Sequence, residues 1–143
     1  MSVVDELAEV VFKLDTRGLS ARAITARVTA AIVEWASANG WAVRTEARIE
    51  IGRPHAAFGD YGYMDAIIHR AAGEPDIAIE IDQTDKPWSV AKLRYANALG
   101  MEAVWIRWSG SSWTDAEGVH VIHLPELERE RLPTKRSSQL TLW

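Results

Sequence analysis

The chain has 143 residues, a length that suits one domain and allows a hydrophobic core without disulfides or metal. It contains no cysteine, which excludes a disulfide framework, thiolate catalysis and cysteine-ligated zinc or iron–sulfur sites. The formal net charge of −4 lacks the basic excess that would indicate nucleic-acid binding directly, although carboxylates that hold a metal ion also lower such a count.

Two features of the sequence bear on cellular location. The N-terminal segment 1–14 carries acidic side chains where a signal peptide would have basic ones. No apolar run reaches the length of a membrane span. We therefore expect a soluble cytoplasmic protein with no membrane partner.

Residues 1–40 predict two helices. Apolar residues recur at helical spacing from Val3 to Leu14, and the pattern breaks at residues 16–18. Ser20 suits the N-cap of a second helix, which ends at Asn39-Gly40.

The rest of the chain alternates between strand and helix patterns. We expect a loop over residues 52–60, a turn over 71–75 and one helix from about Trp88 to Leu99. The expected strands are 41–51, 61–70, 76–82, 103–108 and a short fifth strand at 119–124. A helix between two strands makes them parallel neighbours, so residues 1–132 are predicted to form one α/β domain with a mixed sheet flanked by helices. Residues 133–143 are predicted to be a flexible tail.

Three carboxylates are the candidate site. Glu80 and Asp82 are two residues apart in one expected strand, so they share a face, and Asp65 lies in the strand before it. If these strands pair through the turn at 71–75, Asp65 comes near the same face. Converging carboxylates repel one another, and a divalent cation such as Mg²⁺ relieves that repulsion. From spacing alone, solvent-facing charges at strand ends remain an alternative.

A lysine in the following helix favours the site interpretation. Lys92 projects into the middle of an apolar stripe that we expect to face the sheet. The stripe consists of Trp88, Ala91, Tyr95, Ala96 and Leu99. Lys92 either extends to solvent along that stripe or reaches the carboxylates and supplies positive charge to a phosphate.

The run IAIEID, a helix and then GMEAVWIRW, preceded by the strand that bears Asp65, resembles the PD-(D/E)xK nuclease superfamily. It is similar in particular to small members related to very-short-patch repair endonucleases. The resemblance covers residues 41–108 and the preceding helix. It implies a restriction-endonuclease-like αβββαβ core that hydrolyses phosphodiester bonds in DNA with Mg²⁺ or Mn²⁺. By resemblance, Asp65 and Glu80 are the metal-binding carboxylates, joined by the backbone carbonyl of Ile81.

The sequence departs from the family motif at one position. Asp82 stands where the motif has lysine, giving ExD in place of ExK. In some members the lysine has moved to the following helix, so Lys92 is the candidate for that role, with Lys86 behind it. Asp76, in the literal Pro75-Asp76 pair, lies too close to Glu80 to be the first carboxylate of the motif.

The chain ends with Gln139-Leu140-Thr141-Leu142-Trp143, which resembles the pentapeptide that binds the bacterial polymerase sliding clamp. In that peptide a leading glutamine, two leucines and a closing aromatic, usually phenylalanine, make the contacts. Leu140, Leu142 and Trp143 suit a hydrophobic pocket, and Gln139 suits its polar rim. The alternative is a tail that docks on its own domain.

These observations predict a metal-dependent DNA endonuclease in repair or replication, recruited by the sliding clamp. Two alternatives stay open: a catalytically inactive relative that serves as a DNA-binding or adaptor module, and a toxin or defence factor that targets the clamp. Homodimers are frequent among such nucleases, and the residues neither require nor exclude one.

Overall fold

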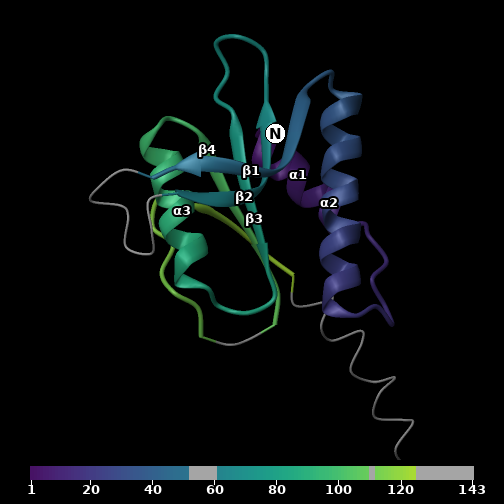
Figure 1. Cartoon of the computed structure of the whole chain (residues 1–143). Helices are drawn as coiled ribbons and strands as arrows, with labels where there is room; N and C mark the ends of the chain where they lie inside the picture. Colours follow the sequence, from purple (N-terminus) through teal and green to yellow (C-terminus); the bar gives the residue numbers. More distant parts are fainter. Residues whose placement is uncertain (52–60, 110–111, 125–143) are drawn as a thin grey trace, which may run out of the picture.

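The computed structural model describes residues 1–51, 61–109 and 112–124. Within them the chain forms three helices and five strands that interleave in an α/β fold (Figure 1). The helices are α1 (Val3–Phe12), α2 (Ala21–Ala38) and α3 (Pro87–Ala98). The strands are β1 (Ala42–Glu50), β2 (Tyr61–His69), β3 (Ile77–Asp82), β4 (Glu102–Arg107) and β5 (His120–His123).

The predicted helices and strands and their order are confirmed, whereas the loop predicted over residues 52–60 and the tail predicted over 133–143 lie outside the described residues. The sheet has the order β1-β2-β3-β4-β5, in which β1, β2 and β3 form an antiparallel meander. The crossover through α3 makes β4 parallel to β3, and β5 is parallel to β4. This is the mixed sheet flanked by helices that the sequence predicts.

Local sequence explains where the helices begin. Ser2 caps α1 in a capping box with Asp5, and the Ser20 hydroxyl accepts a hydrogen bond from the Ala23 N–H at 3.1 Å. Pro87 occupies the first turn of α3, where its missing N–H costs nothing.

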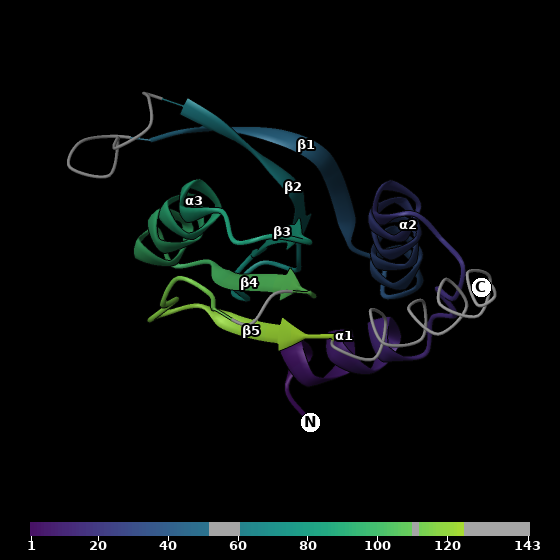
Figure 2. The ribbon, with the colours of Figure 1, turned by 90° about the horizontal axis from the view of Figure 1, so that it is seen from below.

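The sheet separates two hydrophobic layers (Figure 2). Helices α1 and α2 cover one face, where Leu7 and Ile32 pack against the isoleucines of β3. Helix α3 covers the other face, where Leu93 packs near Trp105. Because β3 is buried on both faces, every residue from Ile77 to Asp82 is buried, including its two carboxylates.

A kink bends the β1–β2 hairpin. The pairing skips one residue on each strand, Glu46 and Asp65, and then resumes in the same register, and Glu46 has a φ of 50°, in the left-handed region. In a regular strand Val43 and Ala47 would face the same side of the sheet. Here Val43 packs on the side of α1 and α2, whereas Ala47 belongs to the layer beneath α3. The outer part of the hairpin therefore curls over α3 (Figure 2). We call this part, residues 47–50 and 61–64, the arm.

The predicted sheet-facing stripe of α3 is only partly right. Of its five residues only Ala96 is buried, and Trp88, Ala91 and Tyr95 are half-buried. Leu99 is the C-cap residue and is 58% exposed. The face that α3 buries consists of Ser89, Val90, Lys92, Leu93 and Ala96. Lys92 lies on that buried face, as expected.

Candidate functional site

The carboxylates meet where β2 and β3 separate. The last backbone pair between these strands joins Ala66 and Ile79. Beyond it, the Asp65 N–H donates to Oε2 of Glu80 at 2.8 Å, and the Ile81 N–H donates to Oδ2 of Asp65 at 2.7 Å. Each acidic side chain thus replaces a backbone acceptor that the diverging strand no longer supplies.

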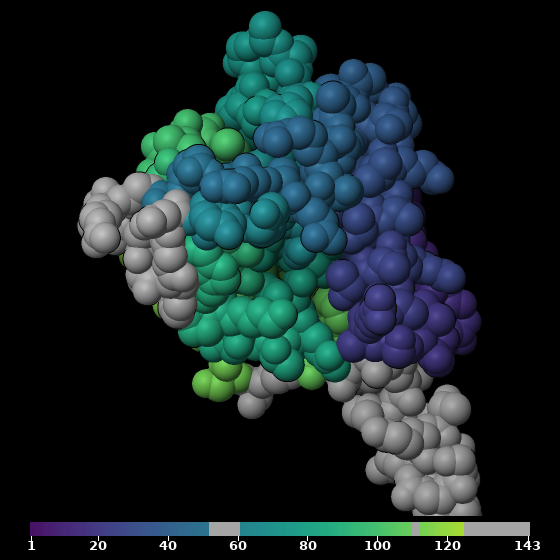
Figure 3. All heavy atoms as spheres, viewed as in Figure 1, coloured from purple at the N-terminus to yellow at the C-terminus, as the bar shows by residue number. Residues whose placement is uncertain are grey.

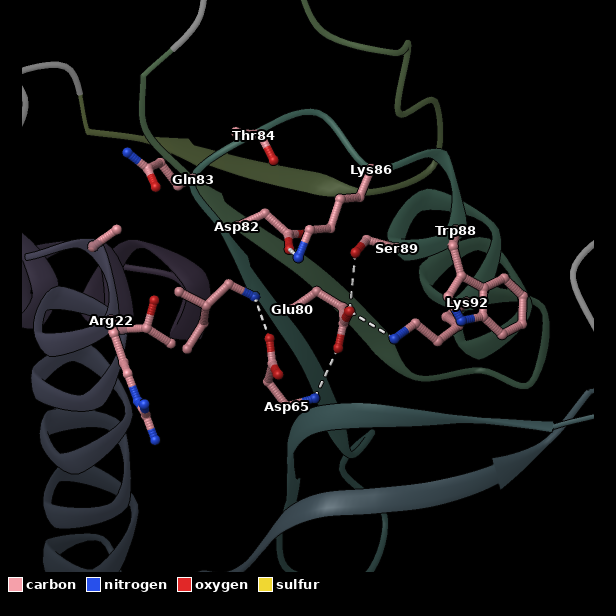
Figure 4. A pocket seen from close by; sticks show the side chains of 13 residues that line it. Arg22, Asp65, Glu80, Asp82, Gln83, Thr84, Lys86, Trp88, Ser89 and Lys92 are labelled. Carbon is pink, nitrogen blue, oxygen red and sulfur yellow. Dashed lines mark hydrogen bonds and ion pairs between the residues drawn. The ribbon is translucent and has the colours of Figure 1, made fainter.

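Glu80 is the most heavily contacted group of the site. Its Oε1 accepts a hydrogen bond from the Ser89 hydroxyl at 3.0 Å and lies 2.8 Å from Nζ of Lys92 (Figure 4). Nζ of Lys92 also donates to the backbone carbonyl of Tyr63 at 2.6 Å. The amine therefore bridges α3, β2 and β3, and its side chain is only 8% exposed.

Asp82 lies in the same cavity but turns toward β4. Its Oδ2 accepts a hydrogen bond from the indole Nε1–H of Trp105 at 2.8 Å, and its Oδ1 lies 3.6 Å from Nζ of Lys86. Lys86 is largely exposed, unlike Lys92. Asp82 thus has a donor of its own, separate from the Asp65–Glu80–Lys92 cluster.

Burial and mutual repulsion make both central carboxyls weaker acids. Burial raises the pKa of Glu80 from 4.5 to about 7, and the neighbouring Asp65 adds to the shift against the attraction of Lys92. Burial likewise raises the pKa of Asp65, and Asp82 contributes in the same direction. A site with this charge balance gains from a cation that neutralises it.

The cluster lies in a cavity of about 460 Å³ between α2 and α3. The first turns of α2 supply Arg22 and Thr25, and α3 supplies Trp88, Ser89 and Lys92 (Figure 4). A second cavity of about 580 Å³ lies along α2 near the kink at Glu46, and it shares Arg22, Thr25 and Asp65 with the first. The two cavities therefore adjoin, and Asp65 lines both.

The carboxylate oxygens of Asp65 and Glu80 fit a hydrated divalent ion. Within the described residues, no three side chains of the types Asp, Glu, His and Cys come together to hold an ion. Oδ1 of Asp65 makes no hydrogen bond to the described residues, while both oxygens of Glu80 have donors. Mg²⁺ commonly takes only one or two carboxylates and keeps several waters, so Asp65 and Glu80 suffice for it.

Some residues of the site were predicted and others were not. Asp65, Glu80, Ile81, Asp82 and Lys92 all line the first cavity. Ser89 was missed, although its position three residues before Lys92 places both on one face of a helix. The backbone carbonyl of Tyr63 carries no sequence signal. The predicted clamp-binding residues 139–143 lie outside the described residues.

Comparison with protein-family models, with curated proteins and with solved structures yields no match. Among the described residues, no helix is both long enough and apolar enough to span a membrane. The assignment that stands on the structure is therefore an α/β fold with a mixed five-stranded sheet.

Proposed function

We propose that the protein is a metal-dependent DNA endonuclease of the PD-(D/E)xK type. One observation carries the proposal. Asp65 and Glu80, from neighbouring strands, converge where the strands separate, and a buried lysine amine lies 2.8 Å from Glu80. Two carboxylates with an amine beside them are the groups needed for metal-assisted phosphodiester hydrolysis.

Each residue has a role that follows from its contacts. Asp65 and Glu80 would hold the metal ion, with the Ile81 carbonyl as a further oxygen ligand. When bound, the ion lowers the pKa of a coordinated water and neutralises charge on the phosphate. Lys92 donates toward the charge that builds on the phosphoryl oxygens. Ser89 and the Tyr63 carbonyl fix Glu80 and Lys92 in place.

Cleavage assays test this proposal. Labelled duplex, mismatched, flap and single-stranded DNA would be incubated with Mg²⁺ or Mn²⁺, with and without a chelator. We expect chelator-sensitive cleavage of at least one substrate, lost in Asp65→Asn and in Lys92→Met. Glu9→Gln, which neutralises an exposed carboxylate on α1, is the matched control and should retain full activity. Cleavage that survives Asp65→Asn would remove the site from the mechanism.

A catalytically inactive DNA-binding or adaptor module is the second candidate. The observation that favours it is the environment of Asp82, which takes the motif's lysine position and is bonded to Trp105. Such a module would bind DNA and a divalent ion without cutting any of the four substrates. Metal binding, measured as a rise in unfolding temperature with Mn²⁺, together with the absence of cleavage would support it.

We extend the proposal to recruitment by the bacterial sliding clamp through Gln139, Leu140, Leu142 and Trp143. The support is the sequence of the C-terminal peptide, which has the polar and apolar contacts that such a pocket needs. The full chain and a chain ending at residue 138 would be compared for binding to purified clamp by surface plasmon resonance. We expect binding only by the full chain, and loss of binding in a Leu140→Ala/Leu142→Ala variant.

The toxin alternative predicts a different cellular outcome. Expression of a full chain that carries Asp65→Asn would still arrest replication if the clamp itself were the target. Under the nuclease proposal that variant is harmless, and a chain lacking residues 139–143 retains cleavage in vitro.

A further inference from the structure

Two tyrosines are exposed on the outer face of the arm. Tyr61 is 46% exposed and Tyr63 is 50% exposed, whereas Gly62 and Met64 between and beside them are buried. Alternate residues of a strand face opposite sides, so both rings point away from α3. Figure 3 shows this side of β1 and β2, which none of the three described helices covers. Large rings in such a position do not contribute to the core.

The two rings contact each other, and one of them also contacts a cation. Tyr61 and Tyr63 meet edge to face, with ring centroids 5.9 Å apart and planes at 87°. The guanidinium of Arg48 lies over the Tyr61 ring, 4.0 Å from its centroid. Arg48 is also paired with Glu50 at 2.6 Å, so the local charge is balanced. The surface therefore offers flat π faces and polar edges with little net charge.

The arm packs closely against the candidate site. A Cβ built on Gly62 would lie 2.7 Å from the Trp88 ring and 2.9 Å from Cδ of Lys92, so only glycine allows this close approach. The Tyr63 carbonyl accepts the hydrogen bond from Nζ of Lys92 at 2.6 Å. The backbone that presents the two rings thus also orients the amine of the site.

The two tyrosines and Asp65 follow one another at every second position of β2. Tyr61, Tyr63 and Asp65 alternate along β2, and the first two are exposed while Asp65 is half-buried. The two-residue step along a strand is about 6.8 Å. Asp65 lines both cavities, and so does Arg22 of α2. A chain laid over the rings would therefore continue past Asp65 toward cavities that also contain a cation.

From this arrangement we infer that Tyr61, Tyr63 and Arg48 form a platform on which unpaired bases of the nucleic-acid substrate stack next to the cleavage site. The inference rests on the proposed nuclease function for the nature of the ligand. Aromatic rings stack on any base, and the base must be out of the duplex to present its face. The near-neutral charge of the platform favours contact with bases over contact with a duplex backbone.

A binding experiment on the full chain tests the platform without cleavage. Fluorescence anisotropy in a chelator would measure binding of a labelled single-stranded oligothymidine. The Tyr61→Ala/Tyr63→Ala pair should bind at least about 30-fold more weakly than wild type, given the usual contribution of stacking per base. The Tyr61→Phe/Tyr63→Phe pair keeps the rings and should bind within about twofold of wild type. Phe12→Ala, which removes an exposed ring from α1, is the matched control and should have no effect.

An abasic oligonucleotide of the same length makes the test specific to stacking. Wild type and the alanine pair should bind it equally weakly, because there is no base to stack. The inference is overturned if the alanine pair binds oligothymidine like wild type, or if the phenylalanine pair loses as much as the alanine pair. It is also overturned if wild type sediments as a dimer that the alanine pair converts to a monomer, because the rings would then contact a second copy. These outcomes are separate from the nuclease proposal, which stands or falls on cleavage and its loss in Asp65→Asn.

Discussion

Replacing Asp65 by asparagine should stabilise the folded protein at alkaline pH while removing its response to metal. Asparagine has the same shape and its Oδ1 can still accept the hydrogen bond from the Ile81 N–H, which Asp65 receives at 2.7 Å. The substitution therefore removes a charge and keeps a contact. The charge it removes is one of the causes of the raised pKa of Glu80.

The magnitude follows from linkage between protonation and folding. The pKa of Glu80 is raised from 4.5 to about 7 in the folded state. The folded state therefore binds this proton more tightly than the unfolded state, and the free energy of unfolding falls as pH rises between the two values. At about 1.4 kcal/mol per pKa unit, the raised pKa costs roughly 3 kcal/mol above pH 7. Burial is the larger cause, so we assign roughly 1 kcal/mol to Asp65, or about 4 °C in melting temperature for a chain of this size.

Urea and thermal unfolding in a chelator, from pH 5 to pH 9, measure this effect. Near pH 5 the variant and the wild type should be close in stability, because Glu80 is protonated in both folded states. Above pH 7 the variant should be more stable by about 1 kcal/mol. Added Mn²⁺ should raise the melting temperature of the wild type and leave that of the variant unchanged. Glu9→Gln should follow the wild type at every pH.

Two results would refute the reasoning. The first is an Asp65→Asn variant that is less stable than wild type at pH 8, which would mean that the carboxylate is an ordinary structural acceptor. The second is an equal response of both proteins to Mn²⁺, which would place any metal ion elsewhere.

Three further substitutions have effects that the contacts determine. Lys92→Met leaves Glu80 without its cation, so the free energy of unfolding should fall by roughly 3 kcal/mol at pH 8. The loss should be smaller at pH 5.5, where Glu80 is protonated, and urea unfolding at both pH values measures the difference. Gly62→Ala should cost about 1–3 kcal/mol in thermal unfolding because its Cβ overlaps an indole ring, and no loss would show that the arm lifts freely. Trp105→Phe removes the donor to buried Asp82 and should cost about 1–3 kcal/mol in urea unfolding, whereas an unchanged midpoint would mean that water replaces the indole.

The convergence of Asp65 and Glu80 was accessible from sequence because it depends on short-range rules. Strands β2 and β3 are joined by a short turn, so they pair with each other. The hydrophobic pattern then determines which residues of each strand face the same side of the sheet. Glu80 and Asp82 are separated by one residue in a strand whose other face is isoleucine. Lys92 was placed correctly because its environment is set by the period of one helix.

The arm was not predictable in the same way, because one residue changes its orientation. Glu46 adopts a positive φ without being glycine or asparagine, so no residue type indicates the kink. Past that point, the residues of β1 and β2 that would have faced one side of the sheet face the other. Tyr61 and Tyr63 therefore lie on the exposed face. The exposure of Leu99 has a related cause, since α3 ends one residue before it and the helical period no longer applies.

The site also determines which substitutions can test it. Asp65 and Glu80 each accept a hydrogen bond from a backbone N–H of the opposite strand, so they serve the fold where the ladder ends. Asp65→Ala leaves the Ile81 N–H without that acceptor, at a cost of about 1–3 kcal/mol, and an inactive alanine variant could simply be a less ordered one. Asp65→Asn keeps the acceptor and changes only the charge. Loss of cleavage in a variant that is equally or more stable than wild type can therefore be attributed to the chemistry of the carboxylate.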